Sequence, residues 1–265
     1  MVVSLKIEQR QEVEIVSLAR PEVLNAISPD MARELTSYFM GLRGRTKVRV
    51  VILRGLGQAF CAGAELGSDA FASEGPGRTQ RQLEMQHLYS SIVREMRSCP
   101  QPIIGLIHGS ACGAGFSLAL ACDVRIAAED ARLNAAYFRV GLGGCDMGSG
   151  YLLPRLIGLS IASELLMTGN FIGAERALAV GLVSKIAPAD SLVEEGMTLA
   201  GDMLRGSPMG LRMTKETLNL SIDAPSLDAG LTIEDRQQVM LIATADHQEA
   251  LQAFQERRAP HFEDK

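Results

Sequence analysis

Several features that mark metal, redox or membrane proteins are absent from this sequence. Its five cysteines are odd in number and form no CxxC pair, which favours reduced, buried thiols in the cytoplasm. Its four histidines show no metal-ligand spacing with Cys, Asp or Glu, so no metal site is predicted. No uncharged apolar stretch reaches the ~18 residues that suggest a membrane span. The first 15 residues alternate polar and apolar side chains, and no signal peptide is expected there.

An excess of basic charge is also missing. The formal net charge is −5, so nothing indicates a nucleic-acid partner or an acidic membrane surface. There is no internal repeat and no low-complexity tract. The chain has 265 residues, of which 47% are hydrophobic and 22% charged, as is usual for a globular protein with a large core.

The order of predicted elements favours an α/β protein with a helical C-terminal region. Segments 13–18, 48–53 and 103–107 are rich in β-branched residues and are predicted strands. Ser28, Pro29 and Asp30 predict a helix start. Strands and helices alternate at first, and a run of helices follows from about residue 151. We therefore predict a core over residues 1–195 and a helical region over 196–265.

Two small-residue segments each follow a predicted strand, namely 60–66 (FCAGAEL) and 109–115 (GSACGAG). Residues this small let a ligand approach the backbone. The second segment also opens a predicted helix, whose first N–H groups are unpaired and carry the positive end of the helix dipole. Facing each other, the two turns would form an oxyanion hole. Taken alone, each is more typical of a tight turn without a ligand, and the GxGxxG fingerprint of a dinucleotide site is absent.

The order and spacing of these and other segments resemble the crotonase (enoyl-CoA hydratase/isomerase) superfamily. The resemblance extends over nearly the whole chain. The matching segments are RPEVLNA at 20–26, FCAGAEL at 60–66, HGSACGAGFSLALACDVRIAAEDA at 108–131, LPRLIG at 153–158, LLMTGNFIGAERALAVGLVSKI at 165–186 and AFQERRAPHF at 253–262.

This resemblance implies a crotonase-like spiral of repeated ββα units, with two roughly perpendicular sheets and a C-terminal helical region used in trimerisation. A homotrimer or a dimer of trimers is therefore expected. The implied partner is an acyl-coenzyme A thioester. Coenzyme A would be part of the substrate, so no separate cofactor is expected.

The resemblance also implies roles for individual residues. The backbone N–H groups of Ala64 and Ala114 would be the oxyanion donors. The coenzyme A path would be lined by Asn25, Ala26, Ala62, Gly63, Ala64, Glu65 and Leu66, with Phe254 and Arg257 reaching the coenzyme A of a neighbouring subunit. Arg20 is a candidate for a phosphate contact, and a solvated arginine is an equally good interpretation.

Two positions depart from the hydratases of this family. Hydration of an enoyl thioester needs two carboxyl groups that hold one water as base and acid. The positions of these two glutamates correspond here to Ser117 and Tyr137. Neither replaces a carboxylate near neutral pH, because the unperturbed pKa of tyrosine is ~10 and that of a serine hydroxyl is far too high as well.

An acid does lie close by, because Asp146 follows a glycine-rich turn in the loop that faces the acyl group in this family. Members that shift double bonds and members that displace halide from aryl-CoA place a working aspartate near this point. Asp146 would then act as a base, or as a nucleophile that forms an ester. Its alternative role is an N-cap for a helix over residues 148–156.

Three hypotheses follow. The first is an acyl-CoA lyase or isomerase of the hydratase/isomerase group, in which Asp146 moves a proton, assisted by Tyr137 or Ser117. The second is an acyl-CoA-binding protein without catalysis. The third is a thioester hydrolase or dehalogenase that works through an Asp146 ester.

Overall fold

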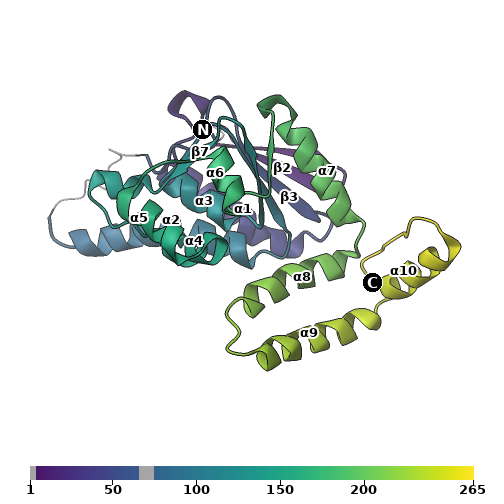
Figure 1. Ribbon diagram of the computed structural model, residues 1–265. Coiled ribbons are helices and arrows are strands. Elements are labelled where there is room, and N and C mark those ends of the chain that lie inside the picture. The colour runs from purple at the N-terminus through teal and green to yellow at the C-terminus, as the bar shows by residue number, and fades with distance from the viewer. Residues whose placement is uncertain (1–3, 66–74) are drawn as a thin grey trace.

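The computed structural model describes residues 4–65 and 75–265, in which helices surround two sheets (Figure 1). The larger sheet has six strands in the order β1-β2-β3-β4-β6-β9. It is parallel from β2 to β9, and β1 pairs with β2 in the antiparallel sense. Its strands are β1 (Leu5–Arg10), β2 (Val13–Leu18), β3 (Val50–Gly55), β4 (Ile103–Ile107), β6 (Val124–Ala128) and β9 (Lys185–Ala187).

A smaller sheet lies beyond the carboxyl end of β4. It consists of β5 (Ser110–Cys112), β7 (Arg132–Asn134) and β8 (Ile172–Gly173), in the order β5-β7-β8. Strand β5 follows β4 after only two residues, so the chain passes directly from one sheet to the other.

Strands β2, β3 and β4 in the middle of the large sheet are buried on both faces, as expected for parallel strands, whereas most of the edge strand β1 is exposed. Val13 and Ile15 of β2 point to one face, where they join the cluster that packs against α7 (Leu192–Leu204). Val16 and Leu18 belong to the main core on the other face. That core includes side chains from α1 (Pro29–Gly41), α2 (Arg78–Ser98), α3 (Ala114–Ala121), α4 (Ser149–Ile157), α5 (Leu159–Thr168) and α6 (Ala174–Ala179). Short 3-10 helices span Pro21–Val23, Leu42–Gly44, Ala136–Val140 and Ala189–Ser191.

Side-chain caps define the starts of several helices. The Ser28 hydroxyl accepts a hydrogen bond from the N–H of Met31 (3.2 Å), and Pro29 occupies the first turn of α1, as the sequence predicts. Ser207, Ser226 and Thr244 cap the last three helices in the same way. These helices are α8 (Pro208–Ser221), α9 (Leu227–Ile242) and α10 (Ala245–Glu256).

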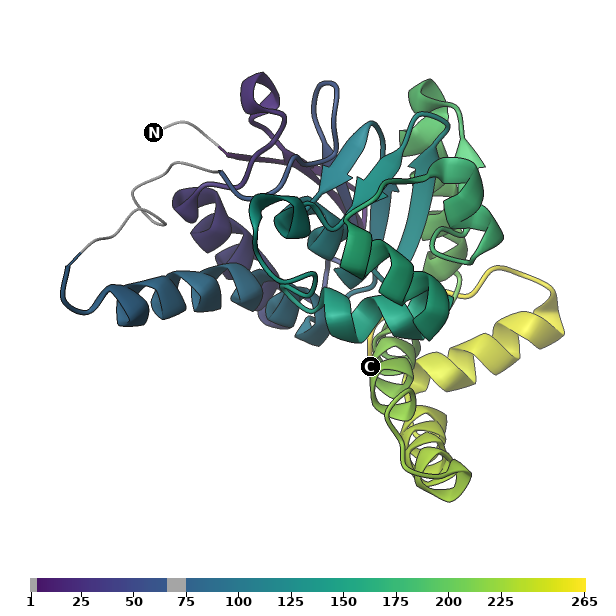
Figure 2. The same ribbon diagram turned by 60° about the vertical axis from the view of Figure 1, so that its left-hand side comes forward.

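The C-terminal helices leave the body of the molecule. In both views α9 and α10 extend away from the sheets, while α8 runs along the lower edge of the body (Figures 1 and 2). The α/β class and the terminal run of helices are thus confirmed. The boundary predicted at residue 195/196 lies inside α7, which packs on the sheet, and the chain departs from the body with α8. Among the described helices, none has both the length and the apolar character needed to cross a bilayer.

Candidate active site

The two small-residue turns meet because their preceding strands are parallel neighbours. The carboxyl ends of β3 and β4 lie at the same edge of the sheet, so the segments that follow them emerge side by side. An isolated bridge then joins Cys61 to Ala111. In this bridge the N–H of Cys61 donates to Ser110 O (3.0 Å), and the N–H of Cys112 donates to Cys61 O (2.9 Å).

The structure leaves two backbone donors unused at this junction. In the bridge between Ile27 and Ala64, the pairing uses the carbonyl of Gly63 and the N–H of Glu65, and not the N–H of Ala64. Ala114 is the first residue of α3, so its N–H has no intrahelical acceptor. Within residues 4–65 and 75–265, neither N–H donates to another protein group. Both are therefore available to a ligand.

Glycines allow this close approach. Gly63 has φ +110°, and a Cβ there would also lie 2.9 Å from Cys112 O. Gly115, in the first turn of α3, packs so tightly that a Cβ would lie 2.3 Å from Cys61 O. The turns thus depend on positions where only a hydrogen fits.

A cavity of about 470 Å³ opens beside these donors. Its lining brings together both turns, α2, the short helix at Ala136–Val140 and the loop that carries Asp146. The lining residues are Ala62, Gly63, Ala64, Gln82, Gln86, Tyr89, Gly113, Ala114, Ala136, Tyr137, Val140, Leu142, Asp146 and Met147. This is the cavity in which an acyl group would meet Asp146.

Asp146 is fixed by its backbone as well as by its side chain. Its carbonyl accepts from the Ser117 hydroxyl (3.1 Å) and its N–H donates to Ser149 Oγ (3.0 Å). Carboxylate oxygen Oδ1 accepts from the N–H of Met147 (2.7 Å) and from the side-chain amide of Gln86. The alternative role as a helix cap is wrong, because Gly148 is the N-cap of α4 and no side chain caps that helix.

Tyr137 and Ser117 lie next to Asp146 but differ in their access to the cavity. Tyr137 lines the cavity, and its hydroxyl donates to Ser149 Oγ at 2.5 Å. Burial raises the pKa of Tyr137 to about 12, against the opposing effect of the Ser149 and Ser117 hydroxyls. Ser117 is completely buried and is not part of the cavity lining.

Two members of this network, Gln86 and Ser149, were not among the predicted site residues. Gln86 lies on α2, 60 residues from Asp146 in sequence. Gln82, Gln86 and Tyr89 recur at the spacing of one helix face, but the sequence does not show that this face meets Asp146. Ser149 gives no comparable sequence signal.

Around the expected coenzyme A path, the polar side chains are already engaged with protein. The guanidinium of Arg20 donates to Ala26 O (2.7 Å) and to the Glu65 carboxylate (3.0 Å). Asn25 is fully buried, and its amide donates to the carbonyls of Leu56 and Ala59. Ala26 and Glu65 flank the Ile27–Ala64 bridge, but none of these four residues is among those that line the cavity. The predicted contact at Leu66 lies outside the described residues.

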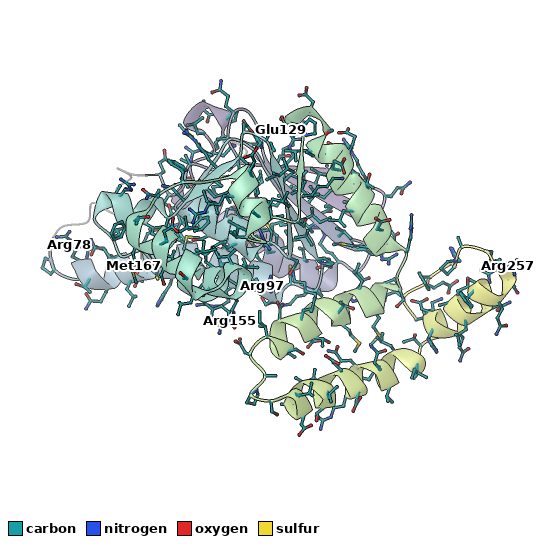
Figure 3. The ribbon with its side chains drawn as sticks, in the orientation of Figure 1. Arg78, Arg97, Glu129, Arg155, Met167 and Arg257 are labelled. Atoms are coloured by element: carbon teal, nitrogen blue, oxygen red, sulfur yellow. The ribbon has the colours of Figure 1, made fainter. Side chains whose placement is uncertain are left out.

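Phe254 and Arg257 are not brought to the cavity of their own chain. They lie at the end of α10, and Figure 3 shows Arg257 at the far end of the projecting helices. Phe254 is 84% exposed. Their expected contact with a neighbouring subunit's coenzyme A stays a prediction.

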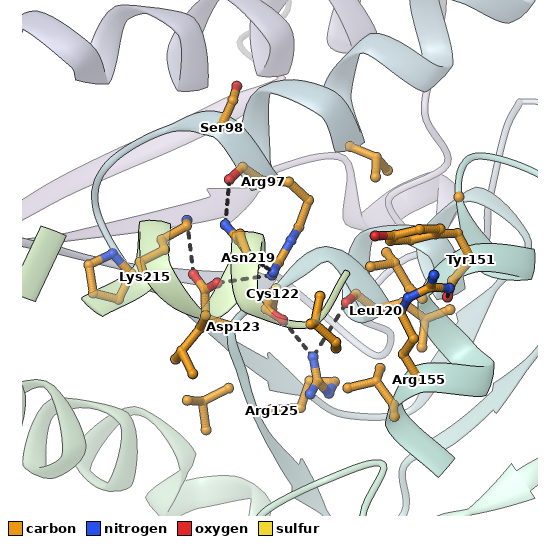
Figure 4. A pocket seen from close by; sticks show the side chains of 18 of the residues that line it. Arg97, Ser98, Leu120, Cys122, Asp123, Arg125, Tyr151, Arg155, Lys215 and Asn219 are labelled. Atoms are coloured by element: carbon orange, nitrogen blue, oxygen red, sulfur yellow. Dashed lines mark hydrogen bonds and ion pairs between the residues drawn. The ribbon is translucent and has the colours of Figure 1, made fainter. Parts of the chain in front are cut away.

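A larger cavity of about 950 Å³ lies elsewhere, between α8, α4 and the C-terminal end of α2 (Figure 4). Several of its charged groups are paired with protein. Asp123 binds Arg97 and Lys215, and Arg155 stacks on the Tyr151 ring at 3.6 Å. Neither Asp146 nor the alanines with unused N–H groups, Ala64 and Ala114, line this larger cavity, whereas all three line the smaller one.

Metal ligands do not gather at either cavity: across residues 4–65 and 75–265, no three His, Cys, Asp or Glu side chains are arranged to hold an ion.

Comparisons with known proteins agree with this geometry. The family model described as enoyl-CoA hydratase/isomerase matches residues 8–265. "Probable enoyl-CoA hydratase EchA12" of Mycobacterium tuberculosis is 36% identical over 96% of this chain and 90% of its own length. "1,2-Epoxyphenylacetyl-CoA isomerase" of Escherichia coli is 31% identical over 94% of each chain. The crystal structure of an enoyl-CoA hydratase from Bacillus anthracis superposes with TM-score 0.92 at 32% identity, covering 99% of this chain and 100% of the other. This likeness confirms the predicted fold.

Proposed function

This chain belongs to the enoyl-CoA hydratase/isomerase family, and from that premise we propose an isomerase-like reaction, in which Asp146 moves a proton in an acyl-CoA thioester. One observation carries the proposal. The Asp146 carboxylate shares a cavity of about 470 Å³ with the two unpaired N–H groups, while Ser117 and Tyr137 occupy the positions of the hydratase glutamates.

The proposed mechanism begins with the thioester oxygen between the N–H groups of Ala64 and Ala114. These donors stabilise the negative charge that grows on the oxygen when a proton leaves the adjacent carbon. Each such donor contributes roughly 3 kcal/mol to stabilising a transition state. Asp146 accepts the proton and returns it at another carbon, which moves the double bond.

Water addition is disfavoured by the same geometry. A hydratase holds its water between two carboxyl groups, and Asp146 is the one carboxylate among the cavity-lining residues that the structure describes. Tyr137, with a pKa of about 12, stays neutral, and Ser117 does not reach the cavity. The relative named as an isomerase supports this direction, whereas several others are named hydratases.

We further infer a trimeric assembly in which the C-terminal helices of one chain approach the active site of the next. This inference is supported by exposed apolar side chains along α8, α9 and α10. Those of Leu218, Leu227, Val239 and Phe254 are each at least 67% exposed. Arg20, Asn25, Ala26 and the Ala62–Glu65 turn would then border the coenzyme A path from the first chain. Light scattering after size exclusion tests the assembly, and a monomer at micromolar concentration would contradict it.

The reaction is tested with a panel of 3-enoyl-, 2-enoyl-, dienoyl- and aryl-CoA thioesters. Formation of the conjugated thioester from a 3-enoyl substrate, without hydration of a 2-enoyl substrate, is the expected result. Asp146→Asn should abolish turnover and preserve coenzyme A binding. Full activity in Asp146→Asn would refute the assignment of the base.

The same panel of thioesters tests the two other hypotheses, a binding protein without catalysis and a hydrolase or dehalogenase. Turnover of any thioester above ~1 s⁻¹, an ordinary low enzyme rate, rules out a binding protein without catalysis. Mass spectrometry of the intact chain during turnover tests the hydrolase or dehalogenase hypothesis, which requires an ester on Asp146. We expect no such adduct.

A further inference from the structure

The two oxygens of the Asp146 carboxylate have different surroundings. Oδ1 accepts two hydrogen bonds, one from the N–H of Met147 at 2.7 Å and one from the amide of Gln86. In the part of the chain that the structure describes, Oδ2 accepts no hydrogen bond from protein. Two donors on a single oxygen fix the rotation of the carboxylate and leave its second oxygen for other partners.

Helix α2 positions the Gln86 amide. Gln82, Gln86 and Tyr89 lie on the face of α2 that lines the cavity. Tyr89 fixes the phase of the helix, because its hydroxyl donates to Ile27 O at 2.9 Å. Ile27 is also the residue that bridges to Ala64. One helix therefore connects the oxyanion turn to the carboxylate that would act on the same substrate.

We propose that Gln86 is the positioning residue for Asp146: its amide holds Oδ1, so that Oδ2 is the oxygen that takes the proton from the acyl-CoA. This inference rests on the proposed function and goes beyond it, because it names the working oxygen and the side chain that selects it. Gln86 itself does not exchange a proton, since a neutral amide has none to give or take near neutral pH.

A hydrogen bond from an amide to a charged acceptor is in general stronger than one to the protonated acid, so a pH profile is a suitable test for the loss of this contact. Replacing Gln86 with leucine should lower kcat on the order of 10- to 100-fold through misorientation of the base. KM should change little. The acidic limb of the kcat/KM profile should move to higher pH in this variant.

Gln86→Glu provides a second, nearly isosteric variant. It places a carboxylate against Asp146, so its acidic limb should lie at still higher pH than that of Gln86→Leu. The matched control is Gln82→Leu, which removes an amide from the same face of α2 one turn away. Gln82 makes no hydrogen bond to Asp146, so this variant should leave the acidic limb in place, whatever its effect on KM.

The experiment measures pH profiles of these three variants and of Asp146→Asn. Unchanged kcat and an unmoved limb in Gln86→Leu would overturn the inference. A loss of kcat in Gln86→Leu without any shift of the acidic limb would also overturn it, because a purely structural role predicts that result. If Gln86→Leu fails to bind coenzyme A, the kcat of Gln86→Glu decides instead: a loss of about 10-fold or more supports the inference, and a wild-type kcat would overturn it. An active Asp146→Asn would instead refute the proposed function, whereas an inactive one with unaffected Gln86 variants would refute this inference alone.

Discussion

Ser117 and Tyr137, which by resemblance correspond to the two hydratase glutamates, both hydrogen bond within the segment from Asp146 to Ser149. The Ser117 hydroxyl bonds the carbonyl of Asp146, and the Tyr137 hydroxyl bonds Ser149, which in turn accepts from the N–H of Asp146. Both side chains therefore support the loop that carries the acid. Neither is arranged to hold a water molecule against a second carboxylate.

Tyr137→Phe distinguishes support from acid catalysis. Loss of one hydrogen bond to Ser149 costs about 1 kcal/mol, so kcat should fall less than about 10-fold. Removing a general acid would instead cost about 10²- to 10⁴-fold. Steady-state kinetics on the preferred thioester measures the difference, and a loss beyond 10²-fold would show that Tyr137 exchanges a proton.

The pH dependence follows from the same residue. Burial raises the pKa of Tyr137 to about 12, so its hydroxyl stays protonated throughout the neutral and mildly alkaline range. Below about pH 10, the wild-type kcat/KM profile should therefore contain no alkaline limb that is due to Tyr137. The profile of Tyr137→Phe should have the same shape in this range. An alkaline limb present in the wild type and lost in Tyr137→Phe would contradict this assignment.

Of the residues around the acid, the sequence could predict Asp146 but not its partner Gln86. Asp146 lies in the loop between segments 108–131 and 153–158, which resemble the crotonase superfamily, and members of that superfamily place a working aspartate near this point. Gln86 reaches it only because α2 packs with one particular phase across the cavity, and this phase depends on tertiary contacts such as Tyr89 with Ile27. For Arg20 the sequence suggested a contact that the structure does not favour. It was a candidate for binding phosphate, and its guanidinium is instead paired with the Glu65 carboxylate.

At the scale of elements, the site depends on two turns that follow neighbouring parallel strands. Gly115 in α3 lets the second turn press against the first, since a Cβ there would lie 2.3 Å from Cys61 O. Any side chain at this position must push the start of α3, and with it the Ala114 N–H, away from the turn at Ala64. Stability and oxyanion geometry are therefore coupled at Gly115.

Gly115→Ala tests that coupling. Overpacking of this kind costs about 1–3 kcal/mol of unfolding free energy, and kcat should fall as the donor moves. The control is Gly201→Ala on α7, where a Cβ would meet nothing within 4 Å. It should raise the unfolding free energy by about 0.5–1 kcal/mol, because alanine favours a helix interior over glycine. Urea titrations compare the two, and equal stabilities would contradict the packing argument.

Helices were more predictable than strands because their ends carry local signals. Ser28 with Pro29, and the serines and threonine before α8, α9 and α10, specify helix starts through caps that form within one turn. By contrast, β5, β7 and β8 have two or three residues each. A sequence pattern of that length cannot predict a strand, and these strands form because distant segments of the chain pair with one another.

At the scale of the whole molecule, a buried charge cluster fastens α8 to the body (Figure 4). Lys215 of α8 is 5% exposed, and its ammonium group contacts Asp123 at 2.9 Å and Gln101 O at 2.8 Å. Asp123 also binds Arg97 of α2 at 2.9 Å. This cluster determines where α8 leaves the body and thus the direction in which α9 and α10 project.

Lys215→Met should lower the unfolding free energy by about 3 kcal/mol, because it leaves a partly buried carboxylate and two carbonyls with fewer donors. Lys185→Met is the matched control. Its ion pair with Glu195 is at the surface, where the lysine side chain is 52% exposed, so the change should be at most about 1 kcal/mol. Denaturant unfolding monitors both. Similar effects in the two variants would show that the cluster does not anchor α8.

In the proposed reaction, Asp146 moves a proton at an acyl carbon that is activated by the Ala64 and Ala114 N–H groups. Incubation of an enoyl-CoA with the enzyme in deuterium oxide, followed by mass spectrometry and NMR of the thioester, tests it most directly. We expect deuterium at the exchangeable acyl carbons with the wild-type protein, almost none with Asp146→Asn, and no hydrated product with either. Wild-type rates of exchange in Asp146→Asn, or hydration that outpaces exchange, would contradict it.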